Sequence, residues 1–214
     1  MRVLIDLCHP ADVHFFHAVT LKLKDKGHDV IYTARDKDVL LPLCNELKIP
    51  HHIIGNHYNT LIGKGWELMS RSGKLSKIAR EMKIDVLAGF GNPYVVIAGM
   101  LCRKPSLFVN DTENAGITNL IGLQAKATLT TNWFGPLQGK RHTQAEWFKE
   151  LAYIENLAMD ELPKKKYLLI RKVAWTANHD LSHSGLDSIE FIKRNMNEID
   201  VYVIKENERS NKKN

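Results

Sequence analysis

The chain opens with an apolar stretch, RVLIDL, that runs directly into residues able to do acid–base chemistry. His9, Asp12 and His14 follow within eight positions of Asp6. An imidazole can remove a proton from a hydroxyl group near neutral pH, and a neighbouring carboxylate can orient it. Asp12 also suits the cap of a following helix, and His14 suits an ordinary surface position. The loop is therefore either a polar turn or the edge of a site.

A second polar cluster, VNDTENAG, follows another apolar stretch. A capping box would explain Thr112 and Glu113, but not Asn110 and Asp111 as well. Carboxylates in such a loop can take part in acid–base catalysis or hold the hydroxyl groups of a sugar. We expect Asp111 and Glu113 to be functional, with Asn110 and Thr112 as binding residues.

Two more clusters complete the set. Gly91 and Asn92 precede Pro93, a pattern that caps a helix and that can also turn backbone N–H groups toward an anion. His179 and Asp180, in TANHDLSHSG, invite a metal interpretation. Nothing nearby completes a coordination set, so we predict no metal site and expect both residues to line a cleft.

The elements that must position these clusters alternate between strands and helices. Strands are predicted at 2–7, 29–34, 51–55, 84–90, 105–110 and 126–131, with helical periodicity between most of them. This alternation predicts an α/β fold with a doubly wound parallel sheet of the Rossmann type. In such a sheet ligands bind beyond the carboxyl ends of the strands, where the polar clusters fall.

The predicted organisation has two unequal parts. Residues 1–132 form an N-terminal Rossmann-like domain, and 133–165, which contain glycines and a proline without strand–helix rhythm, form an interdomain connection. Residues 166–204 hold one β-α-β unit, an incomplete second Rossmann-like domain. The charged tail, 205–214, is expected to be disordered.

Composition excludes several classes of protein. The 214 residues carry a formal charge of +6 and three scattered cysteines, which form neither a disulfide framework nor a zinc motif. We find no signal peptide and no apolar run long enough to span a membrane, so we expect a cytoplasmic location. The sequence has no ladder of aromatic residues of the kind that stacks on single-stranded nucleic acid, so we expect no nucleic-acid partner.

The segment Lys64–Lys83 alternates basic and apolar residues. A basic amphipathic helix can lie on an anionic membrane surface, which would make the protein peripheral to a membrane. The same pattern also describes an ordinary helix that packs on a sheet and exposes its charged face.

Several of these pieces together resemble domain-of-unknown-function family 354, which is grouped with glycosyltransferases of the B-type fold. The matching segments are DVHFF (12–16), GHDVIYTARD (27–36), IDVLAGFGNP (84–93), FVNDTENA (108–115) and VAWTANHDLSHSGL (173–186). The resemblance implies two Rossmann-like domains that face each other across a cleft, as in the related UDP-N-acetylglucosamine 2-epimerases.

The resemblance also implies roles for the residues. His14 would be the general base that activates an acceptor hydroxyl, with Asp111 and Glu113 orienting the acceptor, which is a small molecule or a lipid-linked sugar. His9, Asp12, Gly91 and Asn92 would line the acceptor half, and His179 and Asp180 the other half. A nucleotide sugar would be the donor substrate, without a further cofactor.

Family members continue well beyond the equivalent of Ile204, so the resemblance implies a C-terminally truncated member that lacks the donor site. Three functions therefore stay open. They are a glycosyltransferase, a sugar-nucleotide epimerase that uses acids such as Asp111 and Glu113, and a non-catalytic fragment or subunit of a split protein. Sugar, acceptor and oligomeric state are not specified by the sequence.

Overall fold

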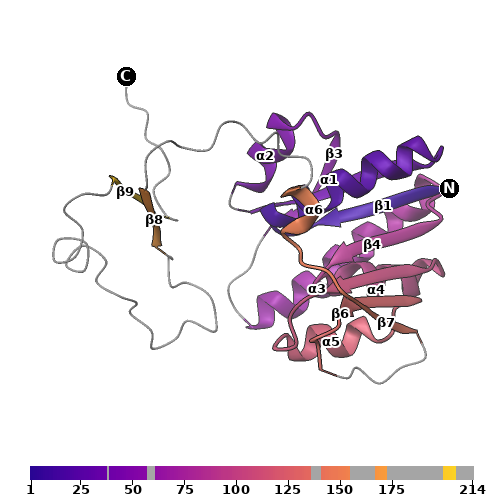
Figure 1. Cartoon of the computed structure of the whole chain (residues 1–214). Helices are drawn as coiled ribbons and strands as arrows, with labels where there is room; N and C mark the ends of the chain where they lie inside the picture. Colours follow the sequence, from indigo (N-terminus) through magenta and orange to yellow (C-terminus); the bar gives the residue numbers. More distant parts are fainter. Residues whose placement is uncertain (38, 57–60, 136–140, 155–166, 173–199, 206–214) are drawn as a thin grey trace. The chain divides into compact units, whose positions relative to one another are not determined.

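The computed structural model describes residues 1–37, 39–56, 61–135, 141–154, 167–172 and 200–205. The chain divides into two compact units, Met1–Leu157 and Ala158–Asn214. In the described part of the second unit, two parallel strands pair with each other, β8 (Tyr167–Lys172) and β9 (Asp200–Lys205). The first unit carries the main sheet and is shown with its helices in Figure 1.

The sheet of the first unit has seven parallel strands in the order β3-β2-β1-β4-β5-β6-β7. They are β1 (Arg2–Leu7), β2 (Asp29–Asp36), β3 (His51–Asn56), β4 (Val86–Phe90), β5 (Ser106–Asn110), β6 (Ala127–Thr131) and β7 (His142–Ala145). The chain builds outward from β1 to β3 and then returns to place β4 on the other side of β1. The doubly wound prediction is confirmed, and the order reverses between β1 and β4.

The helices cover both faces of this sheet (Figure 1). They are α1 (Pro10–Asp25), α2 (Leu40–Glu46), α3 (Leu61–Glu81), α4 (Pro93–Cys102), α5 (Gly116–Gly122) and α6 (Leu151–Ile154). Among the described residues, no helix has the length and apolarity needed to cross a membrane.

Alternation along β1 divides the core in two. Val3, Ile5 and Leu7 point to one face, where they pack in a cluster with residues of α1 and α2. Leu4 points to the other face, in a cluster with residues of α3 and α4. Because side chains alternate along a strand, Asp6 must also point toward the α3 and α4 face. A carboxylate is thereby placed in an otherwise apolar layer.

The first unit extends further than the sequence patterns indicate. Much of the range 133–165, which we expected to be an interdomain connection, adds to the first unit instead. β7 lengthens the sheet beside β6, and α6 packs against α1. The strand HTQA in β7 is short and polar, with partly exposed residues, which is typical of a sheet edge and leaves a weak sequence signal.

Candidate functional site

The loops after β1 and β4 meet at the point where the strand order reverses. The side-chain amide of Asn92, after β4, donates to the carbonyl oxygen of Asp6 at 3.1 Å and to its carboxylate at 2.9 Å. It also lies 3.3 Å from the Cys8 sulfur. Ligands of open α/β sheets bind at such a switch point. These contacts join two of the predicted polar clusters at the place where a ligand is expected.

The loop after β5 adjoins the same place. The N–H of Gly91 donates to the carbonyl of Val109 at 2.7 Å. Gly91 has a φ of 52°, a left-handed conformation that glycine adopts at low cost. A side chain there would also lie 3.4 Å from the Asn110 amide oxygen. The clusters after β1, β4 and β5 therefore form one continuous edge, as the sequence predicted.

The start of α1 is closed by its own side chains. His9 is the N-cap, and its Nδ1 accepts from the N–H of Ala11 at 3.2 Å. Asp12 closes a capping box, because its Oδ2 accepts from the N–H groups of Cys8 and His9 at 3.1 and 3.0 Å. The sequence suggested Asp12 itself as the N-cap, whereas the structure gives that position to His9 and places Asp12 three residues later, where it closes the box.

Asp12 is buried and forms an ion pair. It is 1% exposed, and its Oδ1 lies 3.1 Å from the Lys149 ammonium group. Burial raises the pKa of Asp12, while Lys149 and the N–H of Cys8 oppose that shift to a smaller extent. Lys149 also lies 3.7 Å from the centre of the Phe90 ring, a cation–π geometry. Asp12 thus shapes the loop and does not present its carboxylate to solvent.

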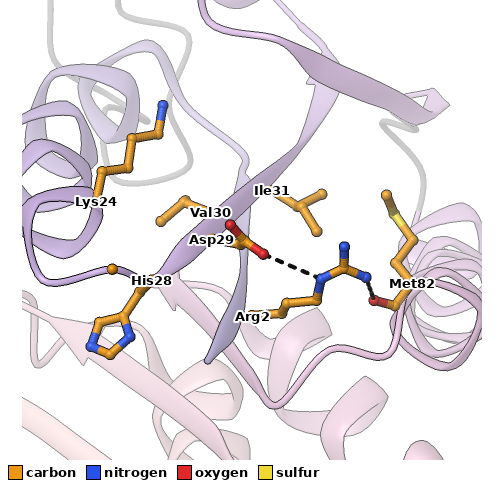
Figure 2. Close-up of a pocket in the computed structure, with 8 residues that line it drawn as sticks. Arg2, Lys24, His28, Asp29, Val30, Ile31 and Met82 are labelled. Atoms are coloured by element: carbon orange, nitrogen blue, oxygen red, sulfur yellow. Dashed lines mark hydrogen bonds and ion pairs between the residues drawn. The ribbon is translucent and has the colours of Figure 1, made fainter.

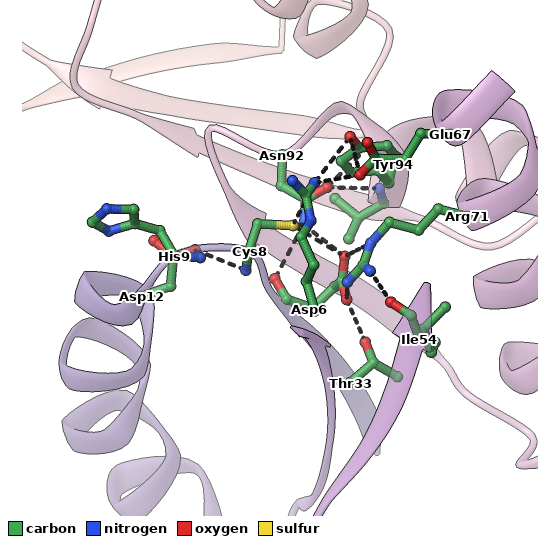
Figure 3. Close-up of polar contacts among 12 residues, drawn as sticks. Asp6, Cys8, His9, Asp12, Thr33, Ile54, Glu67, Arg71, Asn92 and Tyr94 are labelled. Atoms are coloured by element: carbon green, nitrogen blue, oxygen red, sulfur yellow. Dashed lines mark hydrogen bonds and ion pairs between the residues drawn. The ribbon is translucent and has the colours of Figure 1, made fainter. Parts of the chain in front are cut away.

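Beneath the loop lies a buried polar network that the sequence analysis missed (Figure 3). Arg71 of α3 donates to the Asp6 carboxylate at 2.6 and 3.2 Å, and the Thr33 hydroxyl donates to it at 2.6 Å. Arg71 also donates to the carbonyl of Ile54 at the end of β3. Burial opposes the charged form, but the Asp6 carboxylate, together with Cys8 and Tyr94, favours it, and the pKa of Arg71 is raised. The network ties α3 to β1, β2 and β3.

A second ion pair extends the network. Arg35 and Glu67 lie 3.0 Å apart, and both are nearly buried. The Tyr94 hydroxyl, on α4, accepts from Arg35 at 2.9 Å and donates to Glu67 at 3.1 Å. Burial raises the pKa of Tyr94 to about 12. The Tyr94 ring also lies about 5 Å from the guanidinium carbons of Arg35 and Arg71, at 5.3 and 5.4 Å. The second pair anchors α4 and α3 to β2.

Burial and nearby charges make the Cys8 thiol a poor nucleophile. Burial raises the pKa of Cys8, and the adjacent Asp6 carboxylate raises it further. Its sulfur lies 3.5 Å from that carboxylate. Thiolate is the reactive form of cysteine, so this position disfavours nucleophilic chemistry.

The loop after β5, which begins with Asn110 and continues through Glu113, is stabilised by hydrogen bonds from the side chains of Asn110 and Asn119. Asn110 donates to the Thr112 carbonyl at 2.9 Å and to the Asn119 side chain at 2.7 Å. Asn119 in turn donates to the carbonyls of Thr112 and Glu113 at 3.1 and 3.0 Å. Asn110 is buried, whereas the side chains of Thr112 and Glu113 are exposed. Asn110 therefore shapes the loop and supports the exposed residues from below.

The predicted site residues accordingly fall into three groups. Those with surface at the carboxyl edge are His9, His14, Asp111, Thr112, Glu113 and Gly91. Those buried beneath it are Asp12, Asn92 and Asn110. His179 and Asp180 lie outside the described residues. Within the described part of the chain, no three His, Cys, Asp or Glu side chains gather as they would around a metal ion.

The basic helix α3 is amphipathic, but one of its cations does not face solvent. Arg71 is 2% exposed and pairs with Asp6, while Lys74, Lys77 and Arg80 are exposed. Arg71 lies one helical turn before Leu75, which is buried. The buried pair therefore has two signals in the sequence. Arg71 lies on the apolar stripe of its helix, and Asp6 lies inside the apolar strand RVLIDL.

A pocket of about 560 Å³ lies at the opposite edge of the sheet (Figure 2). It is lined by Arg2, Lys24, Gly27, His28, Asp29, Val30, Ile31 and Met82. The Arg2 guanidinium that faces it already contacts the Asp29 carboxylate at 3.5 Å and the Met82 carbonyl at 2.8 Å. Ligands of open α/β sheets bind at the carboxyl ends of the strands, whereas this pocket adjoins the amino ends of β1 and β2. The carboxyl edge is therefore the better candidate for the functional site.

Solved structures with low sequence identity share this fold. MurG from Acinetobacter baumannii aligns with a TM-score of 0.57 at 15% identity, over 96% of this chain and 58% of that one. MnaA from S. aureus, in a co-structure with UDP, aligns with a TM-score of 0.67 at 10% identity, over 95% and 62%. The spinosyn rhamnosyltransferase SpnG aligns with a TM-score of 0.57 at 13% identity, over 96% and 65%.

These structures, which include a rhamnosyltransferase and a UDP-bound protein, share the B-type glycosyltransferase fold, so the fold of the chain is of that type. The chain spans about three fifths of the length of the first two, 58% and 62%. A search of curated protein sequences gives no significant match. The family model described as protein of unknown function (DUF354) matches residues 1–131, and the chain belongs to that family.

Proposed function

We propose that the first unit is the acceptor-binding half of a glycosyltransferase of the B-type fold, with His14 as the general base. The observation that carries the proposal is the place of His14. It lies exposed near the start of α1, directly after the strand at which the sheet order reverses. An imidazole there can reach a ligand at the switch point.

The proposed step transfers a glycosyl group to a hydroxyl. His14 takes the hydroxyl proton as the acceptor oxygen bonds to the anomeric carbon, and the bond from that carbon to the nucleoside diphosphate breaks. Asp111 and Glu113, in the neighbouring loop after β5, hold the acceptor by its hydroxyl groups. The donor is a nucleotide sugar, and His179 and Asp180 are the expected contacts from the second unit.

The test is a transfer assay with UDP-N-acetylglucosamine and a panel of sugar acceptors, read by mass spectrometry. His14→Ala should lower kcat by about a hundredfold or more, the range for loss of a general base. His28→Ala is the matched control, because His28 lies at the opposite edge of the sheet beside the N-terminus. An unchanged kcat in His14→Ala would rule out that role.

An epimerase is the second candidate, and the fold match to MnaA and to UDP-N-acetylglucosamine 2-epimerases favours it. Asp111 or Glu113 would then move a proton at a sugar carbon. The two functions are separated by incubation of the nucleotide sugar alone. An epimerised product without any acceptor would support the epimerase, whereas transfer that requires an acceptor would support the first proposal.

A non-catalytic fragment or subunit is the third candidate. The chain covers 58% of the length of MurG. If the chain folds but binds no nucleotide sugar, as measured by calorimetry, and gains binding with a separately encoded partner, the subunit function replaces the other two.

Association with an anionic membrane is a further proposal for α3. Its exposed residues include Trp66, Met69, Lys74, Lys77 and Arg80, an apolar end followed by a basic end. Flotation with vesicles that contain phosphatidylglycerol, but not with phosphatidylcholine alone, would support it. Equal flotation with both vesicle types would contradict it.

A further inference from the structure

Two helices, α1 and α4, begin at the switch point and direct their N-termini toward the proposed acceptor site. A helix N-terminus carries a partial positive charge and backbone N–H groups without helical partners. It is therefore a ready site for phosphate or carboxylate, provided that those groups are free. Whether they are free decides which acceptors the first unit can take.

At the N-terminus of α1, the backbone N–H groups already donate to acceptors within the chain. Asp12 Oδ2 accepts from the N–H groups of Cys8 and His9. The N–H of Ala11 donates to the His9 ring, and that of Asp12 donates to the His9 carbonyl. Pro10 has no N–H. From Cys8 to Asp12, every backbone donor thus has a partner within the chain.

At α4 the first N–H groups of the helix also have acceptors within the chain. The N–H groups of Tyr94 and Val95 donate to the Asn92 side-chain oxygen at 3.0 and 3.4 Å. The N–H of Gly91 donates to Val109, and Pro93 has none. Asn92 is itself fully buried and anchored to Asp6, so its side chain cannot swing away without breaking that anchor. The Asn92 side chain thus occupies the N–H groups of Tyr94 and Val95, which an anion at this helix start would otherwise accept from.

The charged groups at this edge of the sheet also disfavour a bound anion. The buried Asp12 carboxylate lies at the positive end of α1 and occupies the N–H groups of Cys8 and His9 that an incoming phosphate would need. Lys149, which could attract an anion, is held by Asp12 and by the Phe90 ring. Arg35 and Arg71 are paired with Glu67 and Asp6 beneath the loop. The neighbouring loop adds Asp111 and Glu113, which would repel an anion further.

We infer that the acceptor of the first unit is a hydroxyl-bearing molecule with no phosphate or carboxylate beside the reacting hydroxyl, and that Asp12 is the specificity-determining residue. This inference rests on the proposed acceptor role of the unit. It selects against phosphorylated sugars and sugar diphosphates as acceptors, because the N–H groups of Cys8 and His9 that would bind their anionic group already donate to the buried Asp12 carboxylate. It concerns the acceptor alone and sets no limit on the nucleotide diphosphate of the donor.

The test uses the full chain labelled with ¹⁵N, titrated with inorganic pyrophosphate and followed through its backbone amide signals. In the wild type, the amides of Cys8, His9, Tyr94 and Val95 should not respond. In Asp12→Ala, the Cys8 and His9 amides lose their acceptor and Lys149 loses its partner. Those two amides should then shift with pyrophosphate, and the apparent Kd should fall at least about tenfold.

Two further variants keep the result interpretable. Asp111→Ala removes one negative charge from the same edge without freeing an α1 N–H, so it should not reproduce the gain. Asp12→Asn keeps an acceptor oxygen and the fold, and it should give a smaller gain than Asp12→Ala. If Asp12→Ala does not fold, Asp12→Asn alone must still bind pyrophosphate more tightly than the wild type does.

Three outcomes would overturn the inference. They are pyrophosphate shifts at these amides in the wild type, no gain in either Asp12 variant, and an equal gain in Asp111→Ala. None of these readouts depends on glycosyl transfer, so they stay separate from the His14 assay. Loss of activity in His14→Ala together with wild-type pyrophosphate binding would uphold the proposed function and reject this acceptor class.

Discussion

Arg71 of α3 and Asp6 of β1 face each other through two hydrogen bonds of 2.6 and 3.2 Å, with side chains only 1% and 0% exposed. Two charges this far from water depend on each other for compensation. The pair therefore fixes the longest described helix to the strand from which the candidate site begins. Because Asn92 binds the same carboxylate, the position of the β4–α4 loop depends on the pair as well.

Arg71→Leu should lower the free energy of unfolding by about 3–5 kcal/mol, because it leaves the Asp6 carboxylate buried without a cation. Urea unfolding followed by circular dichroism measures the change. Lys77→Leu is the control on the same helix, since Lys77 is exposed and its pair with Glu81 spans 3.8 Å at the surface. That control should stay within about 0.5 kcal/mol of the wild type.

The double variant Asp6→Asn/Arg71→Leu sharpens this prediction. With the charge removed from both partners, its loss of stability should be smaller than the sum of the two single losses. Additive losses would show that the two residues stabilise the fold independently and would contradict the pairing argument.

Asp12 should make stability fall as pH rises through its titration. Burial raises the folded-state pKa of Asp12 above its ordinary value of 3.8, so the folded chain binds that proton more tightly than the unfolded chain does. The free energy of unfolding contributed by Asp12 is therefore fully present below pH 3.8 and is lost as pH rises through the folded-state pKa.

The measurement is urea unfolding of the wild type and Asp12→Asn at a series of pH values from below 3.8 to neutral. The asparagine variant lacks the titration, so the stability of the wild type relative to the variant should decline across the series. A relative stability that grows with pH would mean that the Lys149 ion pair outweighs burial, which is the opposite sign.

Two helical glycines should respond in opposite directions to the same substitution. A Cβ at Gly122, the last residue of α5, would lie 2.5 Å from the Phe108 ring of β5. Because Phe108 is fully buried, it has little room to move, and Gly122→Ala should destabilise by about 1–3 kcal/mol. At Gly73 in α3 a Cβ meets nothing within 4 Å, so Gly73→Ala should stabilise by about 0.5–1 kcal/mol. Thermal unfolding of both variants checks the pair, and a shift of the same sign in both would contradict it.

The strands and most helices were predictable because their signals are local. Apolar runs such as RVLIDL, Pro93 after a capping Asn92, and Gly27 after a helical stretch specify elements within a few residues. Polar residues at strand ends could then be placed at one edge by the rules of parallel sheets alone. Here Asn92 and Gly91 do meet the loops from β1 and β5.

The buried network was not predictable in the same way, because its partners are far apart in sequence. Asp6 and Arg71 are separated by 65 residues, and Lys149 reaches Asp12 across 137. Periodicity can mark Arg71 as lying on a buried stripe, but it cannot name the carboxylate that receives it. For the same reason the sequence suggests Asp12 as a substrate contact, although in the structure it closes the capping box of α1 and pairs with Lys149.

Trp147 should show that the segment after β7 belongs to the folded first unit. Its ring lies 5.8 Å from Phe15 of α1 and 5.9 Å from Phe90 of β4, and its indole N–H donates to the Thr130 carbonyl at 3.1 Å. Trp147→Ala should therefore destabilise the main unfolding transition by about 2–4 kcal/mol, and Trp147→Phe, which loses mainly the hydrogen bond, by about 1 kcal/mol.

Trp133→Ala is the matched control for this prediction. Trp133 is half exposed and contacts Phe148 with ring centres 4.6 Å apart, so its removal should cost less than about 1 kcal/mol. If the segment folded separately, Trp147→Ala would leave the main transition in place and add an earlier one. A single shifted transition instead means that this segment unfolds together with the rest of the first unit. Lys149, two residues further along the chain, then keeps its ion pair with Asp12 as long as the unit is folded. The exclusion of an anion at α1 requires this pair.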